Sequence, residues 1–394
     1  MLTPMELPAL TPDEAAQTER VAARIRREVD AAGGWIPFRQ FMQLALYAPG
    51  LGYYSAGARK FGAAGDFITA PELTPVFARC LATQLAETLA ATGGGNVLEA
   101  GAGTGALAAD LLAALAERDA LPERYWILEI SADLRDRQRR LLVDRVPTLA
   151  ERVAWLDAPP ASPWRGVAIA NEVLDALPVE RFQVDQHGYR QVGVEWWQER
   201  FAFAARPAGE WLARQLDDRL GSLPERPATG FEGEFSPLIR PWIAEFARGL
   251  ERGALLFVDY GLPRAPYYHP SRAAGSLTGF FRHRRVEDVL ARPGLQDITA
   301  WVDFTEVAEG GAAAGLDVAG FATQAHFLIA TGLERELAAA SEHLDVAARA
   351  RLAQAVATLV MPGEMGERFK AIALARGLEA PLAGFAFRDL AATL

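Results

Sequence analysis

The chain has 394 residues, enough for two or three domains or for one domain with large insertions. Hydrophobic residues make up 51% and charged residues 23%, which is typical of a globular protein that buries a core. The formal net charge of −10 excludes a nucleic-acid grip built on overall basicity. The single cysteine, Cys80, excludes an intramolecular disulfide and a cysteine-rich metal site.

The beginning of the chain shows no targeting pattern, because Met1–Leu10 lacks a basic region followed by an apolar stretch. No window approaches the roughly 20 consecutive apolar residues that a membrane-spanning helix needs. We therefore expect a cytoplasmic protein without membrane insertion. The five histidines have no metal-ligand spacing, so no metal site is expected.

Residues 1–92 are predicted to form an N-terminal helical cap. Thr11–Glu14 has the pattern of a capping box and opens the first helix. Further helices are predicted over Pro37–Tyr47 and Pro75–Ala91. Between these two, Pro49–Asp66 contains five glycines among aromatic residues. A loop of that length in a compact chain predicts a functional or a mobile segment.

From residue 93 onward, short apolar runs alternate with helical segments, which predicts a mostly parallel, doubly wound α/β sheet. The predicted strands are Asn96–Ala100, Tyr125–Ile130, Val153–Leu156, Val167–Ala170, Ala254–Val258, Leu316–Ala322 and Phe369–Ala375. Helices are predicted at Thr104–Arg118 and Ser131–Val146.

An insertion separates the fourth and fifth predicted strands. Its segments Val179–Asp185 and Tyr189–Trp196 alternate apolar and polar residues, which favours a small antiparallel sheet. We predict one elaborated domain over residues 93–394, with 176–250 as an inserted subdomain on the substrate side.

A glycine-rich turn, Gly101–Gly105, follows the first predicted strand and opens a helix, which is the setting of a nucleotide-binding turn. With Glu129 as the acid for a ribose, it matches the loose dinucleotide fingerprint. With Glu99, it matches the Glu-x-Gly-x-Gly-x-Gly turn of S-adenosylmethionine (SAM) methyltransferases. A buried Glu99 repels a pyrophosphate but can pair with the cationic methionyl end of SAM. We therefore favour SAM binding by Glu99, Gly101, Gly103, Gly105 and Glu129 over a dinucleotide or a mere packing turn.

Polar residues follow two further predicted strands. Asp157 either contacts the adenine amino group or is a solvated acid at a strand end. Asn171, Glu172 and Asp175 lie after the fourth strand, at the carboxyl edge where ligand crevices form. They are expected to face the transferable methyl group, with Asn171 among the cofactor ligands; alternatively, Asn171 and Asp175 cap a short turn.

Asp66 and Thr69 stand at the end of the glycine-rich loop. This loop can close over the cofactor and exclude water, which makes Asp66 a candidate catalytic acid and Thr69 a candidate cofactor ligand. The alternative is that both residues organise the turn before Pro71.

These residues together resemble the MidA-type SAM-dependent methyltransferases, which are related to a mitochondrial factor that methylates an arginine during respiratory complex I assembly. Besides the turns above, the resemblance is carried by Pro37–Tyr47, Gly52-Tyr53-Tyr54, Gly65–Glu72, Asn171–Pro178, Asp259-Tyr260-Gly261, Tyr267–Arg272, Arg282-His283-Arg284, Asp297-Ile298-Thr299, Val302-Asp303-Phe304, Thr323–Leu328 and Met365–Lys370. It implies the class I methyltransferase fold, a Rossmann-like doubly wound sheet, with SAM as cofactor. By analogy, it implies methylation of an arginine on a protein partner.

The expected acceptor is therefore an arginine of a subunit of the respiratory NADH–quinone oxidoreductase. A guanidinium has a pKa of about 12.5–13.8 and arrives charged, so carboxylates are needed to hold it and to direct its charge. Glu172, Asp175 and Asp66 are the acids expected there. A lysine or a small molecule as acceptor, and a SAM-binding assembly chaperone without turnover, remain alternatives.

Overall fold

The computed structural model describes residues 8–55, 69–379 and 381–394. The chain folds into two compact units, each assembled from three separate stretches. The first unit takes Met1–Phe67, Ala176–Leu238 and Arg264–Trp301; the second takes Ile68–Asp175, Ile239–Pro263 and Val302–Leu394.

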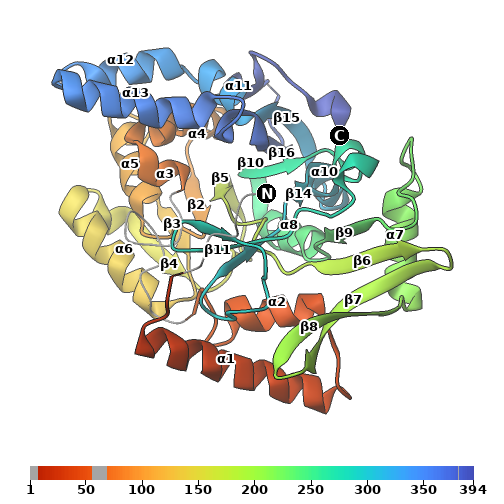
Figure 1. Ribbon diagram of the computed structural model, residues 1–394. Coiled ribbons are helices and arrows are strands. Elements are labelled where there is room, and N and C mark those ends of the chain that lie inside the picture. The colour runs from red at the N-terminus through yellow and green to blue at the C-terminus, as the bar shows by residue number, and fades with distance from the viewer. Residues whose placement is uncertain (1–7, 56–68, 380) are drawn as a thin grey trace. The chain divides into compact units, whose positions relative to one another are not determined.

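Within its described residues, the second unit contains an eight-stranded mixed sheet (Figure 1). The strands are β2 (Asn96–Ala100), β3 (Tyr125–Leu128), β4 (Val153–Leu156), β5 (Trp164–Asn171), β10 (Leu250–Leu262), β14 (Val302–Asp303), β15 (Asp317–Thr323) and β16 (Phe369–Arg376). Strands β4, β3, β2, β5 and β10 are parallel in that order. β16 pairs antiparallel with both β10 and β15, and β14 adds parallel to the end of β10. The carboxyl ends of β2, β3, β4 and β5 therefore meet at one edge of the sheet.

Helices accompany these strands along the chain. They are α3 (Ala70–Leu73), α4 (Pro75–Thr92), α5 (Ala106–Ala116), α6 (Ala132–Arg145), α8 (Ile239–Arg248), α10 (Phe304–Ala313), α11 (Gln324–Ala330), α12 (Leu333–Ser341), α13 (Val346–Val360) and α14 (Met365–Arg368). Short 3₁₀ turns lie at Ala150–Arg152, Ala383–Phe385 and Ala391–Thr393.

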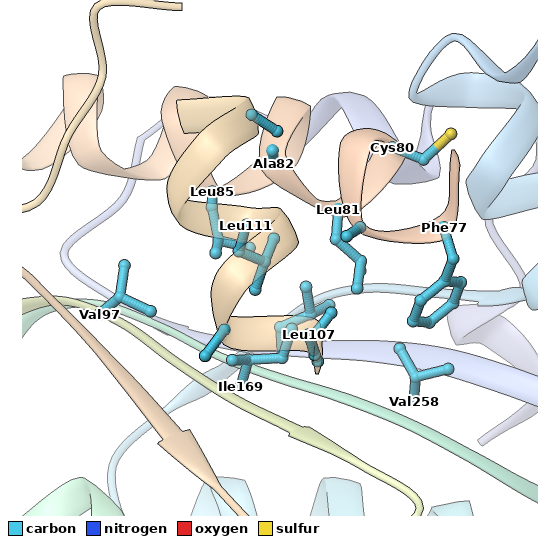
Figure 2. Close-up of a cluster of buried hydrophobic side chains, with 14 of the residues drawn as sticks. Phe77, Cys80, Leu81, Ala82, Leu85, Val97, Leu107, Leu111, Ile169 and Val258 are labelled. Carbon is cyan, nitrogen blue, oxygen red and sulfur yellow. The ribbon is translucent and has the colours of Figure 1, made fainter. Parts of the chain in front are cut away.

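The core of the second unit lies where α4 and α5 pack on the sheet. Figure 2 shows Leu81 and Leu85 of α4 and Leu107 of α5 above Ile169 of β5, and all four side chains are buried. On the opposite face, Trp242 of α8 stacks edge-on against Phe257 of β10, with ring centroids 5.5 Å apart. Helices thus cover both faces, and the predicted α/β sheet is confirmed.

The first unit is built on antiparallel strands. A five-stranded sheet contains β1 (Ile36–Pro37), β6 (Glu180–Asp185), β7 (Gly188–Trp197), β8 (Arg200–Pro207) and β9 (Glu232–Phe235). A three-stranded sheet contains β11 (Thr278–Phe281), β12 (Arg284–Val286) and β13 (Asp297–Thr299). The helical segments are α1 (Pro12–Ala31), α2 (Phe38–Tyr47), α7 (Glu210–Leu220), α9 (Arg264–Tyr267) and the 3₁₀ turn Pro270–Arg272. Val21 and Ile25 of α1 share a buried cluster with Phe38 and Phe41 of α2 and with Val194 of β7.

The elements that local patterns predicted are present, with differences at their ends. The capping box is present, since the Glu14 carboxylate accepts the Thr11 N–H at 2.7 Å and the Thr11 hydroxyl accepts the Glu14 N–H. The helix predicted from Thr104 begins two residues later, at Ala106, because Gly105 adopts a left-handed conformation. The strand predicted to reach Ile130 ends at Leu128.

The two compact units divide the chain differently from the predicted domains. Helix α4 groups with the eight-stranded sheet and not with α1 and α2, because its apolar face, including Val76, Leu81 and Leu85, is buried in the core there. Arg264–Trp301, which we predicted within the methyltransferase domain, groups with the first unit.

Candidate functional site

The glycine turn between β2 and α5 requires glycine for two reasons. Gly101 and Gly105 have φ angles of 67° and 89°, in the left-handed region that side chains disfavour. A Cβ at Gly101 would also lie 2.8 Å from Cγ2 of Val173. The turn therefore brings the end of β2 into close contact with the segment that follows β5.

Glu99 is the acid of β2, two residues before Gly101, and its side chain is buried. The hydroxyl of Tyr125 on β3 donates to its Oε2 at 2.6 Å. Burial raises the pKa of Glu99 to about 7, although the Tyr125 hydrogen bond opposes the shift. Near neutral pH the carboxyl group can therefore change its charge, and a cation bound nearby would favour the ionised form.

Glu129 lies just beyond the carboxyl end of β3 and is buried. Its carboxylate accepts the Ser131 N–H at 2.8 Å and the Gln138 amide at 3.3 Å. Burial raises the pKa of Glu129, while the hydrogen bonds from Ser131 and Gln138 lower it. The next side chain, Ile130, is 73% exposed, so an apolar surface stands beside this acid. The sequence pattern identifies Ile130 only as the end of a strand.

Asp157 follows β4 and is exposed, with its carboxylate 2.6 Å from Arg135 of α6. The same guanidinium donates to the Leu156 carbonyl at 3.0 Å, and Arg135 Nε donates to the Glu129 carbonyl. Arg135 thus joins the ends of β3 and β4. Both interpretations of Asp157, a contact for adenine or a solvated acid, are compatible with this position.

The segment after β5 brings Asn171, Glu172 and Asp175 to the carboxyl edge of the sheet. Glu172 has a φ of 54°, an uncommon conformation for a residue other than glycine. Its N–H donates to the Val258 carbonyl of β10 at 2.9 Å, which holds the backbone of this residue against the sheet. Strained residues of this kind concentrate at functional sites.

A buried acid on β10, Asp259, organises this segment. Its Oδ2 accepts the N–H groups of Val173, Leu174 and Asp175 at 3.2, 2.9 and 3.2 Å. Its Oδ1 accepts the N–H of Tyr260 at 2.9 Å. Burial raises the pKa of Asp259 well above its ordinary value, and the negative charges of Asp175 and Glu172 raise it further.

Asp259 is not among the site residues predicted from the sequence, although it belongs to a resemblance motif. The available signal was an acid at the carboxyl end of the predicted strand Ala254–Val258. The electrostatic effects also show that Asp175 and Glu172 lie close enough to Asp259 to act on one buried carboxyl group.

Helix α3 contacts both the glycine turn and the segment after β5. The Glu172 Oε1 accepts the Ala70 N–H at 3.3 Å and the Asn171 amide at 3.0 Å. The Thr104 hydroxyl donates to Glu72 of the same helix. Thr69 precedes α3 as its N-cap residue, without a capping hydrogen bond from its side chain. Asp66 lies outside the described residues.

The donor and acceptor set at this edge fits a SAM molecule. The Oδ1 atom of Asn171 is buried and has no hydrogen-bond partner among the residues described, so it can accept a donor from a ligand. Glu129 offers a carboxylate for the ribose hydroxyls, Ile130 an apolar surface for the base, and Glu99 an acid whose charge responds to a cation. The described part of the chain contains no cluster of His, Cys, Asp and Glu arranged to hold a metal ion. None of its helices is both long and apolar enough to cross a membrane.

The sheet order, the glycine turn and the acids at the strand ends define a SAM-dependent methyltransferase. A family model described as "Putative S-adenosyl-L-methionine-dependent methyltransferase" matches residues 80–322, and the chain belongs to this family. S-adenosyl-L-methionine is its cofactor.

Relatives and solved structures agree with this assignment. The chain is 30% identical to "Protein arginine methyltransferase NDUFAF7, mitochondrial" of Danio rerio over 372 residues, which cover 86% of this chain and 83% of the relative. The Rattus norvegicus protein of the same name is 28% identical over 402 residues, covering 92% and 86% of the two chains.

A crystal structure from Burkholderia thailandensis, described as a "likely methyl transferase" and bound to S-adenosyl-homocysteine, is 43% identical. It superposes with a TM-score of 0.92 over 99% of this chain and 100% of that one. The resemblance to the MidA-type family is thereby confirmed.

Proposed function

We propose that this methyltransferase modifies an arginine side chain of a partner protein, with a subunit of the respiratory NADH–quinone oxidoreductase as the candidate partner. The names of the relatives support arginine as the acceptor. The observation that carries the proposal is the pair of carboxylates after β5, Glu172 and Asp175, on a segment whose N–H groups Asp259 binds at the carboxyl edge of the sheet.

These carboxylates suit a guanidinium acceptor. A guanidinium is planar, carries several N–H donors in a fixed fork and stays charged at neutral pH, so one nitrogen must be made more nucleophilic than the others. Carboxylates that bind the far nitrogens hold the plane and draw positive charge away from the attacking nitrogen.

We assign these tasks to Glu172 and Asp175, with Asp66 as a further predicted acid. Bound SAM supplies the electrophilic methyl group. We also assign to Glu172, whose side chain is only partly buried, the task of accepting the proton that the methylated nitrogen releases.

The test is transfer of a labelled methyl group from SAM to partner proteins in a lysate, followed by mass spectrometry of the labelled residue. We expect methylarginine, and we expect Glu172→Gln and Asp175→Asn each to lower turnover by roughly 100-fold. Affinity for S-adenosylhomocysteine should stay within about threefold of the wild type, since neither change touches the glycine turn. Glu245→Gln, at an exposed acid of α8, is the matched control and should transfer methyl groups normally.

Two results would contradict the proposal. A methyl label found on lysine or on a small molecule would show that the acceptor is not arginine. A wild type that binds SAM and captures partners but labels none of them would favour the assembly chaperone.

A further inference from the structure

Gln138 of α6 has a buried side chain, with an exposed fraction of 0%, that joins three parts of the candidate cofactor site. Its Nε2 donates to the Gly103 carbonyl in the glycine turn at 3.0 Å and to the Glu129 carboxylate at 3.3 Å. Its Oε1 accepts the indole N–H of Trp155 on β4 at 2.8 Å. One amide group therefore connects β2, β3 and β4 just where their carboxyl ends meet.

The chemistry of the partners permits only one orientation of this amide. An indole N–H can only donate, so it must face the amide oxygen. The Gly103 carbonyl and the Glu129 carboxylate can only accept, so they must face the two amide hydrogens. A flipped amide would place its oxygen against two acceptors. The Gln138 side chain is consequently a rigid spacer between Gly103 and Glu129.

The backbone of Gln138 also packs against the glycine turn. A Cβ added at Gly105 would lie 3.3 Å from the Cα and Cγ atoms of Gln138, tighter than ordinary van der Waals contact. Gly105 is therefore required partly because α6 lies so close. The same residue thus sets the distance from α6 to the turn and the distance from the turn to Glu129.

We propose that Gln138 is a positioning residue for the cofactor site. It holds the Glu129 carboxylate at the distance from the glycine turn at which this carboxylate can accept the ribose hydroxyls of SAM. This inference rests on the predicted binding role of Glu129 and is independent of the methyl acceptor. A carboxylate can bind both hydroxyls of a ribose only if its distance from the backbone that holds the rest of the ligand is fixed.

The experiment compares two ligands by calorimetry: S-adenosylhomocysteine and its analogue without the 2′ and 3′ hydroxyls. Gln138→Glu keeps the size of the side chain and an acceptor for Trp155 but places an oxygen against Glu129. We expect this change to lower the affinity for S-adenosylhomocysteine at least about tenfold, which is the effect of losing one hydrogen bond to a charged group. The affinity for the analogue should fall clearly less, because a disturbance of the Gly103 turn acts on both ligands, whereas only S-adenosylhomocysteine offers hydroxyls to Glu129. Gln138→Leu, which removes both donations without adding a charge, should show the same selectivity.

Gln84→Leu is the matched control. Gln84 of α4 is also buried and also bonds a glutamate and a backbone group: its Nε2 donates to Glu87 at 2.7 Å and its Oε1 accepts the Gly384 N–H at 2.8 Å. This change should lower the melting temperature as the Gln138 variants do, while leaving the affinity for both ligands unchanged.

Glu129→Gln separates the inference from its premise. If Glu129→Gln lowers the affinity for S-adenosylhomocysteine and neither Gln138 variant lowers it, Gln138 has no positioning role. Equal losses for the two ligands would also overturn the inference, since they would show a general structural defect. If Glu129→Gln itself leaves the affinity unchanged, the predicted role of Glu129 is wrong and the inference falls with it.

Discussion

Glu99 provides the sharpest prediction, because its pKa of about 7 lies within the range of ordinary binding measurements. If the ionised carboxylate pairs with the cationic methionyl end of SAM, protonation must weaken binding. For a group with this pKa that must be charged, the dissociation constant at pH 6 is about 11-fold above its high-pH limit, and at pH 8 only about 1.1-fold. Binding at pH 7 should release about half a proton.

Glu99→Gln removes the titrating group while keeping an oxygen that can accept the Tyr125 hydroxyl. Its affinity for SAM should be independent of pH between about 6 and 8 and weaker than that of the wild type at pH 8. The assay is isothermal titration calorimetry at several pH values, repeated in two buffers with different ionisation enthalpies to count protons. Equal wild-type affinities at pH 6 and pH 8, or the same pH dependence in Glu99→Gln, would refute the pairing.

The same pKa shift has a consequence for stability. Because burial raises the folded-state pKa of Glu99 above its ordinary value of 4.5, folding favours the protonated acid, and this contribution is lost as the pH rises from about 4.5 to about 7. The full shift corresponds to about 3 kcal/mol. We therefore compare the free energies of unfolding of Glu99→Gln and the wild type in urea, without ligand. As the pH rises from 5 to 8, the difference should shift in favour of Glu99→Gln by up to that amount. A constant difference between the two proteins would contradict the shift.

Three further predictions concern other parts of the site and the core. Gly101→Ala should lower the free energy of unfolding by about 2 kcal/mol, because of the left-handed φ at this position and the close contact with Val173. Adding Val173→Ala to this variant should restore only the part that is due to the contact. Full restoration would refute the argument from the backbone conformation. Asp259→Asn should lower kcat by about tenfold or more and weaken the binding of S-adenosylhomocysteine by less, because a displaced segment after β5 moves the acids directly and reaches the glycine turn only through Val173; equal losses in kcat and affinity would contradict this reasoning. Cys80 should resist iodoacetamide at pH 8 in the folded protein and react in urea, because burial raises the pKa of its thiol to about 12; rapid labelling of the folded protein would contradict that burial.

Local sequence patterns predicted the elements that carry the cofactor turn. Alternation of mainly apolar runs with helices locates β2, β3 and β4 to within two residues, because the parallel strands of such a sheet are short and mostly apolar. Glu99 and the glycines of the turn could be chosen because their chemistry depends on neighbours in the sequence.

The residues that hold the site in place could not be chosen in this way. Asp259 bonds N–H groups 84 to 86 residues away, and Gln138 bonds Gly103 across 35 residues, so neither contact leaves a local pattern. The left-handed backbone of Glu172 is also invisible in the sequence, because glutamate rarely adopts it and only the surrounding contacts enforce it.

The grouping of the chain into two units depends on the same kind of long-range contact. The sequence predicts α4 as a helix, as it does α2, and only the packing of α4 on the sheet decides which unit it joins.

A crystal structure of this protein with S-adenosylhomocysteine tests the central claim most directly. The account predicts the ligand over the turn Gly101–Gly105, with its ribose hydroxyls on Glu129 and its sulfur facing Glu172 and Asp175. A ligand bound elsewhere, or a sulfur that faces away from both carboxylates, would contradict it.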